Sequence, residues 1–222
     1  MKTLIFLLVF GSLSACEMKH NDHSKENVMA QKSIVDFVKA NDITAVKSAL
    51  NNGADVNTTD KRGRSLLLLA TIEKQMEMAK LLVSYKADVN LQDNQLDSPF
   101  LYAGATGQTE LVALFLENGA RFDVFNRYNG TALIPACERG HVETVKVLVK
   151  TKGFPINHVN RLGWTALMEA VILGNGSGKY QEIVQILKDH GADLNIPDHS
   201  GKTPLQHAES LGFKEIIRIL KP

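Results

Sequence analysis

The chain has 222 residues, of which 44% are hydrophobic and 22% are charged, so it holds ample apolar material for a folded core. Its 25 basic and 24 acidic side chains give a formal charge of +1, and removal of the predicted leader, which contains Lys2, leaves 24 of each. This balance excludes the basic composition typical of nucleic-acid-binding proteins, so no nucleic-acid partner is expected.

The N-terminus has the pattern of an export signal. Lys2 supplies a positive charge, Leu4 to Phe10 form an apolar run too short to span a bilayer, and Leu-Ser-Ala-Cys at residues 13–16 supplies a small-residue cleavage site. These features resemble a bacterial lipoprotein signal. The resemblance implies a signal peptide over residues 1–15 and lipidation of Cys16. An ordinary secretory signal with a chance cysteine is the alternative.

Lipid attachment would anchor the protein to a membrane without a transmembrane helix. Because Glu17 rather than Asp follows Cys16, the resemblance to Gram-negative lipoproteins implies the outer membrane, with the periplasmic face as the usual destination. Residues 16–30 are then a flexible polar tether. His20 and His23 could ligate a metal ion, but two histidines without a third partner favour a solvated linker, and no metal is expected.

Residues 130–153 predict two short helices joined by a tight turn. Thr131 stands where an N-cap hydroxyl accepts from free amides, Gly140 ends the first helix and Gly153 ends the second. Neither helix is long enough to be stable alone, so the unit must bury its apolar faces against similar neighbours. The apolar face of the second helix is formed by Val142, Val145, Leu148 and Val149.

Two landmarks show that such neighbours exist. The residue that opens each unit recurs at Ser65, Ser98, Thr131, Thr165 and Thr203. The residue that closes each unit recurs at Asn57, Asn90, Asp123, Asn157 and Asn195. Both series have steps of 33, 33, 34 and 38 residues, so two independent landmarks keep the same phase along most of the chain.

These units resemble the ankyrin repeat. Its Thr-Pro-Leu-His motif is approached by residues 98–101 (Ser-Pro-Phe-Leu), 165–168 (Thr-Ala-Leu-Met) and 203–206 (Thr-Pro-Leu-Gln), and its closing motif by residues 53–57 and 191–195. The resemblance covers residues 31–222. It implies an all-α solenoid of helix pairs with β-turn fingers, made of an N-terminal cap and about five repeats, the last truncated.

The sequence departs from the family motif in a systematic way. The motif His is replaced throughout, by Leu68, Leu101, Ile134, Met168 and Gln206. Packing is therefore expected to join neighbouring repeats more than a polar network. Lys86 also replaces the terminal Gly of its repeat, which costs roughly 1 kcal/mol or more if the backbone there is left-handed.

The two ends and one insertion are distinctive. The first helix pair lacks the opening motif and any preceding finger, as an N-terminal cap requires, and is built on Ile34, Val35, Val38, Val46 and Leu50. Extra residues at 174–180 contain Gly and Lys, but the spacing of a phosphate-binding loop fails and no strand precedes them. A flexible surface loop is predicted, which could serve as a contact site.

No catalytic motif survives inspection of the sequence, which contains no Gly-x-Ser-x-Gly, no His-Glu-x-x-His and no cysteine cluster. Asp60, Asp93 and Asp198 recur at one repeat position and are interpreted as turn-forming residues of the fingers. Cys137 falls where the family carries Ala and is expected to be buried. We therefore expect a binding module that is not an enzyme and holds no cofactor.

In the family, the fingers and the ends of the first helices line one concave groove. The predicted partner-binding residues are the basic, aromatic and apolar side chains at these positions: Lys61, Arg62, Arg64, Arg127, Tyr128, Arg161, Leu162, Trp164 and Lys202. Arg, Tyr and Trp often dominate binding energy. Three alternatives stay open. The basic side chains could serve solubility alone, or they could contact anionic lipid headgroups. Trp164 could pack on a neighbouring finger.

These features predict a monomer, tethered by lipid to a membrane, that binds a protein partner on its concave face. The chain resembles bacterial ankyrin-repeat lipoproteins that act as immunity proteins against phospholipase effectors of secretion systems. That resemblance implies occlusion or misalignment of the effector active site. The alternative function is a periplasmic scaffold that stabilises another envelope protein, such as an oxidative-stress enzyme.

Overall fold

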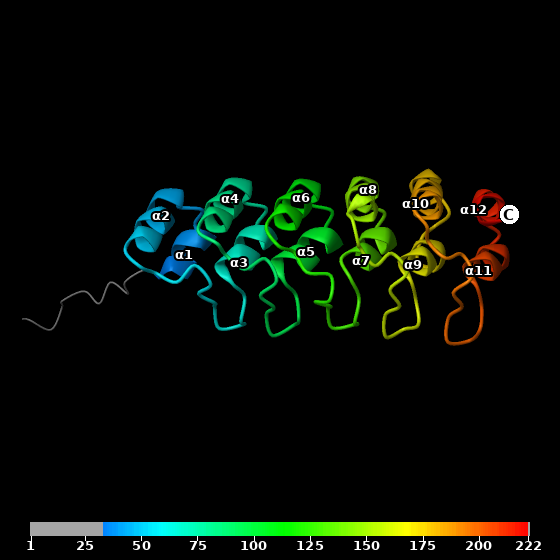
Figure 1. Cartoon of the computed structure of the whole chain (residues 1–222), viewed down its shortest axis with the longest axis horizontal. Helices are drawn as coiled ribbons and strands as arrows, with labels where there is room; N and C mark the ends of the chain where they lie inside the picture. The colour runs from blue at the N-terminus through cyan, green and yellow to red at the C-terminus, as the bar shows by residue number, and fades with distance from the viewer. Residues whose placement is uncertain (1–32, 222) are drawn as a thin grey trace, which may run out of the picture. The chain divides into compact units, whose positions relative to one another are not determined.

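The computed structural model describes residues 33–221, which form an array of twelve helices in six consecutive pairs (Figure 1). The signal peptide, Cys16 and the tether predicted for residues 1–30 lie outside the described residues. The helices are α1 (Ile34–Lys39), α2 (Ile43–Asn51), α3 (Leu66–Ile72), α4 (Met76–Ser84), α5 (Pro99–Ala105), α6 (Thr109–Glu117), α7 (Leu133–Glu138), α8 (Val142–Lys150), α9 (Ala166–Ile172), α10 (Gly178–Asp189), α11 (Pro204–Leu211) and α12 (Lys214–Leu220). Between residues 33 and 221, none of the helices has the length and apolar character needed to cross a membrane.

The helices of this array lie in two layers. Odd-numbered helices form one layer and even-numbered helices the other, and each helix packs on the equivalent helix of the next pair (Figure 1). Five loops, the fingers, project beyond the odd-numbered layer (Figure 1). The described residues contain no β-strand, only an isolated bridge between Thr59 and Ser65. The predicted all-α ankyrin-repeat solenoid is confirmed.

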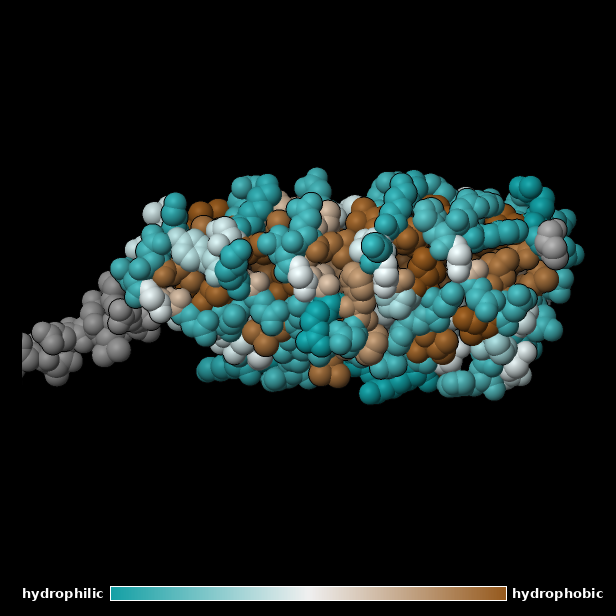
Figure 2. All heavy atoms as spheres, viewed as in Figure 1, coloured by the Kyte–Doolittle hydropathy of each residue, from teal (hydrophilic) through white to brown (hydrophobic). Residues whose placement is uncertain are grey.

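Apolar side chains hold the two layers together. Helices of six to twelve residues are too short to be stable in isolation, so their stability comes from burying one face. Hydrophobic residues run in a band along the array, while hydrophilic residues cover the outer helices and the fingers (Figure 2). Cys137 belongs to this core, as expected, and burial raises the pKa of its thiol well above the ordinary value.

Four of the five opening residues cap the helix that follows. The side-chain oxygens of Ser65, Ser98, Thr165 and Thr203 each accept from the backbone N–H three residues later. The prediction that Thr131 does the same is wrong. Its helix begins at Leu133, its hydroxyl is buried, and no partner for that hydroxyl exists among residues 33–221.

Pro135 explains why Thr131 differs. In the other four repeats the residue four positions after the cap donates its N–H to the carbonyl oxygen of the cap residue, as Glu169 does to Thr165 at 3.0 Å. Proline has no N–H, so this bond cannot form at Thr131. Ala132 accordingly has helical angles, φ −60° and ψ −27°, and takes over the cap position without a side-chain hydrogen bond.

The predicted helix ends are confirmed by the backbone. Gly140 and Gly153 have φ of 73° and 78°, which glycine adopts without a Cβ penalty. Lys86 has φ of 68° at the position where other repeats carry Gly, so the condition under which the sequence analysis assigned it a cost is met. The left-handed backbone at Lys86 destabilises the fold locally, and packing of the surrounding residues offsets this.

The insertion in the fourth full repeat differs from the prediction of a flexible loop over 174–180. Gly178, Lys179 and Tyr180 form the first turn of α10, which has 12 residues where α8 has 9. Tyr180 is 7% exposed and its hydroxyl donates to the Glu138 carbonyl oxygen at 2.9 Å. The extra residues lengthen a helix because the Tyr180 ring buries apolar area against the preceding repeat.

A polar ladder accompanies the packing between repeats, which was not expected. The closing side chains Asn57, Asn90 and Asn157 accept from backbone N–H groups of the next repeat, at 2.8–2.9 Å. Asn90 and Asn157 also donate to carbonyl oxygens there. The missing motif His therefore does not leave the repeats joined by packing alone.

The ladder is interrupted once, after α6. Asp123 occupies the closing position there, and Pro155 occupies the position whose N–H would complete the contact. Asp123 instead pairs with Arg121 at 2.8 Å on the surface. At this step the rings of Phe122 and Phe154 pack with centroids 4.9 Å apart, so aromatic contact replaces the hydrogen bonds.

Candidate partner-binding groove

The five fingers share one loop geometry. Each finger consists of five residues, and the first to fifth fingers are residues 60–64, 93–97, 126–130, 160–164 and 198–202. In each finger the first side chain is Asp or Asn, and its Oδ1 accepts from the N–H groups two and four residues later at 2.8–3.0 Å. The interpretation of Asp60, Asp93 and Asp198 as turn-forming residues is confirmed, and Asn126 and Asn160 have the same role.

The fourth residue of each finger has a left-handed backbone. Glycine fills this position in three fingers, whereas Leu96 and Asn129 adopt it with φ of 60° and 59°. Two pairs of neighbouring fingers are also bonded to each other: the N–H of Asn94 donates to the Arg62 carbonyl oxygen at 3.1 Å, and the N–H of Arg161 donates to the Tyr128 carbonyl oxygen at 2.8 Å. The fingers therefore form a preorganised row and not a set of independent loops.

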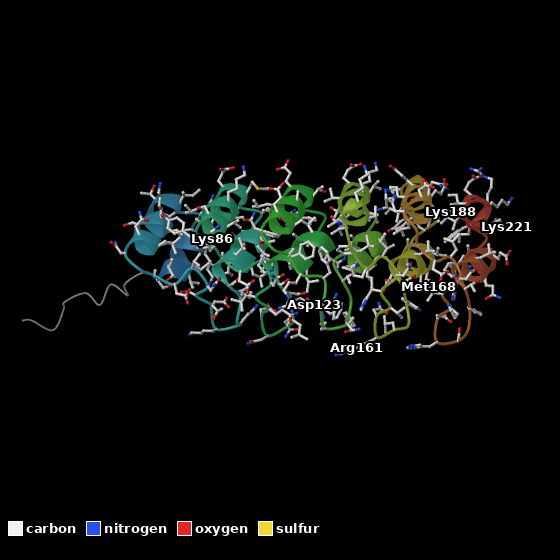
Figure 3. The ribbon with its side chains drawn as sticks, in the orientation of Figure 1. Lys86, Asp123, Arg161, Met168, Lys188 and Lys221 are labelled. Atoms are coloured by element: carbon white, nitrogen blue, oxygen red, sulfur yellow. The ribbon has the colours of Figure 1, made fainter. Side chains whose placement is uncertain are left out.

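All nine predicted partner-binding residues lie on this row. Arg161 is at the tip of the finger between α8 and α9 and points away from the helices (Figure 3). Lys61, Arg62, Tyr128 and Lys202 are exposed on their own fingers, and Leu162 is 49% exposed. The arrangement brings the predicted set to one edge of the array, as expected if the fingers form an interaction surface.

Three of the predicted arginines are already engaged within the row. The Arg64 guanidinium pairs with the Asp60 carboxylate at 2.6 Å, inside its own finger. Arg127 lies 3.6 Å from Asp97 and stacks over the Tyr128 ring at 5.1 Å. Arg161 donates to the Arg127 carbonyl oxygen at 3.1 Å. Arg64 stabilises its own finger, because its ion-pair partner Asp60 belongs to the same loop.

The row borders a cavity of about 370 Å³ between α5, α7 and α9. Its mouth carries three of the large exposed apolar side chains, Tyr128, Leu162 and Leu173, which are 47–50% exposed. A second hollow, of about 760 Å³, lies between α1 and the first finger and includes Lys61, Arg62 and Arg64. Trp164 and Lys202 line neither hollow, and Trp164 is partly buried at the base of its finger.

The floor of the first cavity contains a carboxyl group that the sequence analysis missed. Glu169 of α9 is 4% exposed, and its Oε1 accepts from Asn160 Nδ2 at 3.0 Å. Burial, followed by repulsion from Glu138, raises its pKa from 4.5 to about 7. A carboxylate in an otherwise apolar helix, Ala-Leu-Met-Glu-Ala-Val-Ile, is the signal that could have revealed it.

The other titratable groups do not form a reactive constellation. Burial raises the pKa of Asp97, which also lines the cavity and faces Arg127. Across the part of the chain that the structure describes, no group of three or more His, Cys, Asp or Glu side chains could hold a metal ion. His20 and His23 lie outside that part. The site combines a preformed hollow with charged and apolar side chains, which is the chemistry of recognition.

Comparison with known proteins defines the class. A family model for ankyrin repeats (three copies) matches residues 34–126 and 121–198, so the chain belongs to the ankyrin repeat family. An ankyrin repeat domain from Acinetobacter baumannii AYE is 46% identical with a TM-score of 0.82, over 84% of this chain and 95% of that one. The ankyrin repeat protein EF0377 is 40% identical with a TM-score of 0.82 over the same shares.

Among curated proteins, the ankyrin repeat protein YahD from Escherichia coli strain K12 is 38% identical over 179 residues, which are 81% of this chain and 89% of YahD. The similarity to all three relatives extends over most of the array. Ankyrin repeat domains typically bind protein partners, and the array described here is consistent with a protein–protein interaction module.

Proposed function

We propose that this protein is a lipid-anchored envelope component whose finger row and adjoining cavity bind a protein partner. The observation that carries the proposal is the concentration of Tyr128, Leu162 and Leu173 around one cavity, each about half exposed. Tyrosine is enriched in binding hot spots, and preformed hollows lined by apolar and aromatic side chains are typical of binding sites. Because hydrogen bonds already join the fingers, the ordering cost on association is small.

The test is co-purification of a partner from an envelope extract with the full-length protein. Replacing Tyr128 and Leu162 by Ala should abolish capture, whereas Leu211→Ala should not, because Leu211 is 47% exposed and lies outside the cavity. Arg64 is left unchanged in this experiment, since its substitution would disturb its own finger. Equal capture by all variants would refute the role of the cavity mouth.

We further propose anchoring through Cys16 at the periplasmic face of the outer membrane. Support comes from the sequence pattern of residues 1–16, in which charge, apolar run and cysteine coincide. Cys16→Ser should release the protein from the membrane fraction and abolish labelling by a fatty-acid analogue. Retention of the label in that variant would exclude this lipidation site.

The partner that we propose is a phospholipase effector of a secretion system, which the protein would neutralise as an immunity protein. The combination of a lipid anchor with a binding array supports this, since both would be needed where such an enzyme attacks a membrane. Cells that lack the protein should be killed by sibling cells that deliver the effector. Survival of those cells, together with capture of a resident envelope protein, would favour the scaffold function instead.

A further inference from the structure

The cavity beside the third and fourth fingers has an acidic floor. Glu138 of α7 and Glu169 of α9 both line it, and Glu138 is the one charged group that shifts the pKa of Glu169. Among residues 33–221, no ion pair joins either carboxyl group to a basic side chain. Glu169 is nevertheless 4% exposed, so a carboxyl group is held in a buried setting without a counter-charge.

The two arginines that line the same cavity contact groups other than Glu138 and Glu169. Arg127 lies 3.6 Å from Asp97, and Arg139 Nη1 donates to the Ala105 carbonyl oxygen at 2.6 Å. Neither arginine forms an ion pair with Glu138 or Glu169. A cation that enters the cavity would relieve the repulsion between Glu138 and Glu169, whereas an anion would increase it.

The mouth of the cavity is apolar on the side of the fourth repeat. Leu162 and Leu173 are 49% and 47% exposed, and Tyr128 on the third finger is 50% exposed. The cavity volume of about 370 Å³ is at the small end of the roughly 300–1,000 Å³ that ligand pockets span, so it suits one long side chain. Lys and Arg combine an apolar stem with a charged end and match such a pocket.

We propose that this cavity receives a lysine or arginine side chain of the protein partner, whose charged end meets the Glu169 and Glu138 carboxyl groups while flanking apolar residues of the partner cover Tyr128, Leu162 and Leu173. The proposal rests on the proposed function and names the chemistry of the partner segment. Glu169 is the specificity-determining residue. Asn160 positions its carboxyl group through the 3.0 Å hydrogen bond.

The experiment is selection of a phage-displayed library of random peptides on the immobilised full-length protein at pH 8. Enriched peptides should share a Lys or Arg between apolar residues. When they are synthesised, replacing that basic residue by Gln should weaken binding about tenfold or more, as expected for loss of one charge-assisted contact. Absence of enrichment, or enrichment of peptides without a shared basic residue, would overturn the proposal.

The protein variant that tests the site is Glu169→Gln, which keeps an oxygen for the Asn160 amide but removes the charge. It should weaken binding of the selected peptides about tenfold or more. The matched control is Glu110→Gln, on the exposed first turn of α6, which should bind as the unchanged protein does. Equal binding by Glu169→Gln would refute the proposal even if the peptides contain a basic residue.

A second readout is the pH dependence of peptide binding. Affinity should rise about tenfold between pH 6 and pH 8 as Glu169 loses its proton, and this rise should be absent in Glu169→Gln. The other titratable or charged groups that line the same cavity are Asp97, Tyr102, Arg127, Tyr128, Glu138 and Arg139, and Cys137 of α7 also interacts electrostatically with Glu169. A rise that persists in the variant would assign the effect to one of these groups and contradict the role of Glu169.

The two proposals can fail separately. If an envelope protein is captured through Tyr128 and Leu162 but Glu169→Gln captures it equally well, the binding function stands and the basic-side-chain inference fails. If selected peptides depend on Glu169 while no envelope protein is captured, the cavity chemistry stands and the proposed function fails.

Discussion

Asn160 and Glu169 are joined by a hydrogen bond of 3.0 Å from Asn160 Nδ2 to Glu169 Oε1. The next repeat contains the equivalent contact at the same spacing, with His207 Nε2 2.8 Å from Asp198 Oδ2. In both repeats the first residue of a finger, whose Oδ1 closes the turn, also holds a side chain of the following helix. The finger and the groove side of that helix are thus fixed to each other by one residue.

The buried carboxyl group should make stability depend on pH. Because folding raises the pKa of Glu169 from 4.5 to about 7, its stabilising contribution is full below pH 4.5 and is lost as the pH rises to about 7. Glu169→Gln should unfold like the unchanged protein near pH 4.5 and be more stable at pH 8, by about 3 kcal/mol at most. Urea unfolding of both proteins at several pH values measures this.

The two buried threonine hydroxyls at opening positions should respond differently to the same substitution. Thr131 and Thr165 are both 2% exposed, but only Thr165 accepts a hydrogen bond, from the Met168 N–H. Thr131→Val should be neutral or stabilising by about 1 kcal/mol, because it removes an unsatisfied group. Thr165→Val should destabilise by about 1 kcal/mol through loss of the cap. Thermal unfolding of both variants decides, and equal effects would contradict the assignment.

The left-handed position after the second helix of each pair offers another matched comparison. Lys86 has φ of 68° and Gly119 has φ of 87° at equivalent sites. Lys86→Gly should raise the free energy of unfolding by about 1 kcal/mol, and Gly119→Lys should lower it by a similar amount. A Cβ at Gly119 would meet nothing within 4 Å, so the backbone alone sets the effect. Chemical denaturation of the two variants measures it.

The polar ladder predicts unequal costs for two closing residues. Asn90→Ala should destabilise by roughly 1–3 kcal/mol, because it loses hydrogen bonds to Gly119 and Arg121 of the next repeat. Asp123→Ala should cost less than Asn90→Ala does, since the pairing of Asp123 with Arg121 is on the surface. Denaturant titration of the two variants provides the test, and a larger loss for Asp123→Ala would be inconsistent with the interruption of the ladder.

The phase of the opening and closing landmarks was sufficient to predict six helix pairs and the row of fingers, because each unit repeats the same local rules. The failure at Thr131 has a local cause, since Pro135 removes one N–H, and it could have been read from the sequence. The helical turn at Gly178 was missed because the burial of Tyr180 against the preceding repeat outweighs the poor helix propensity of glycine.

The cavity itself was beyond the reach of sequence periodicity. Its lining comes from three repeats, and Glu138 and Glu169 meet there although 31 residues separate them in the chain. Alignment of the repeats places Glu169 on the groove side of α9. That Glu169 has no ion-pair partner depends on Arg127 contacting Asp97 and on Arg139 contacting the Ala105 carbonyl oxygen. Which group each arginine contacts is determined by the three-dimensional packing and cannot be predicted from the repeat period.

The contact between Phe122 and Phe154 gives the array a junction with its own temperature response. Between other consecutive repeats, hydrogen bonds of the closing asparagines fix the distance between the closing motifs. At this step the closing motifs meet through two phenyl rings, whose attraction is mainly hydrophobic. Hydrophobic attraction weakens on cooling. The closing motifs on either side of Asp123 are therefore expected to loosen from each other first in the cold, while polar contacts such as that of Arg139 with Ala105 still join the helices there.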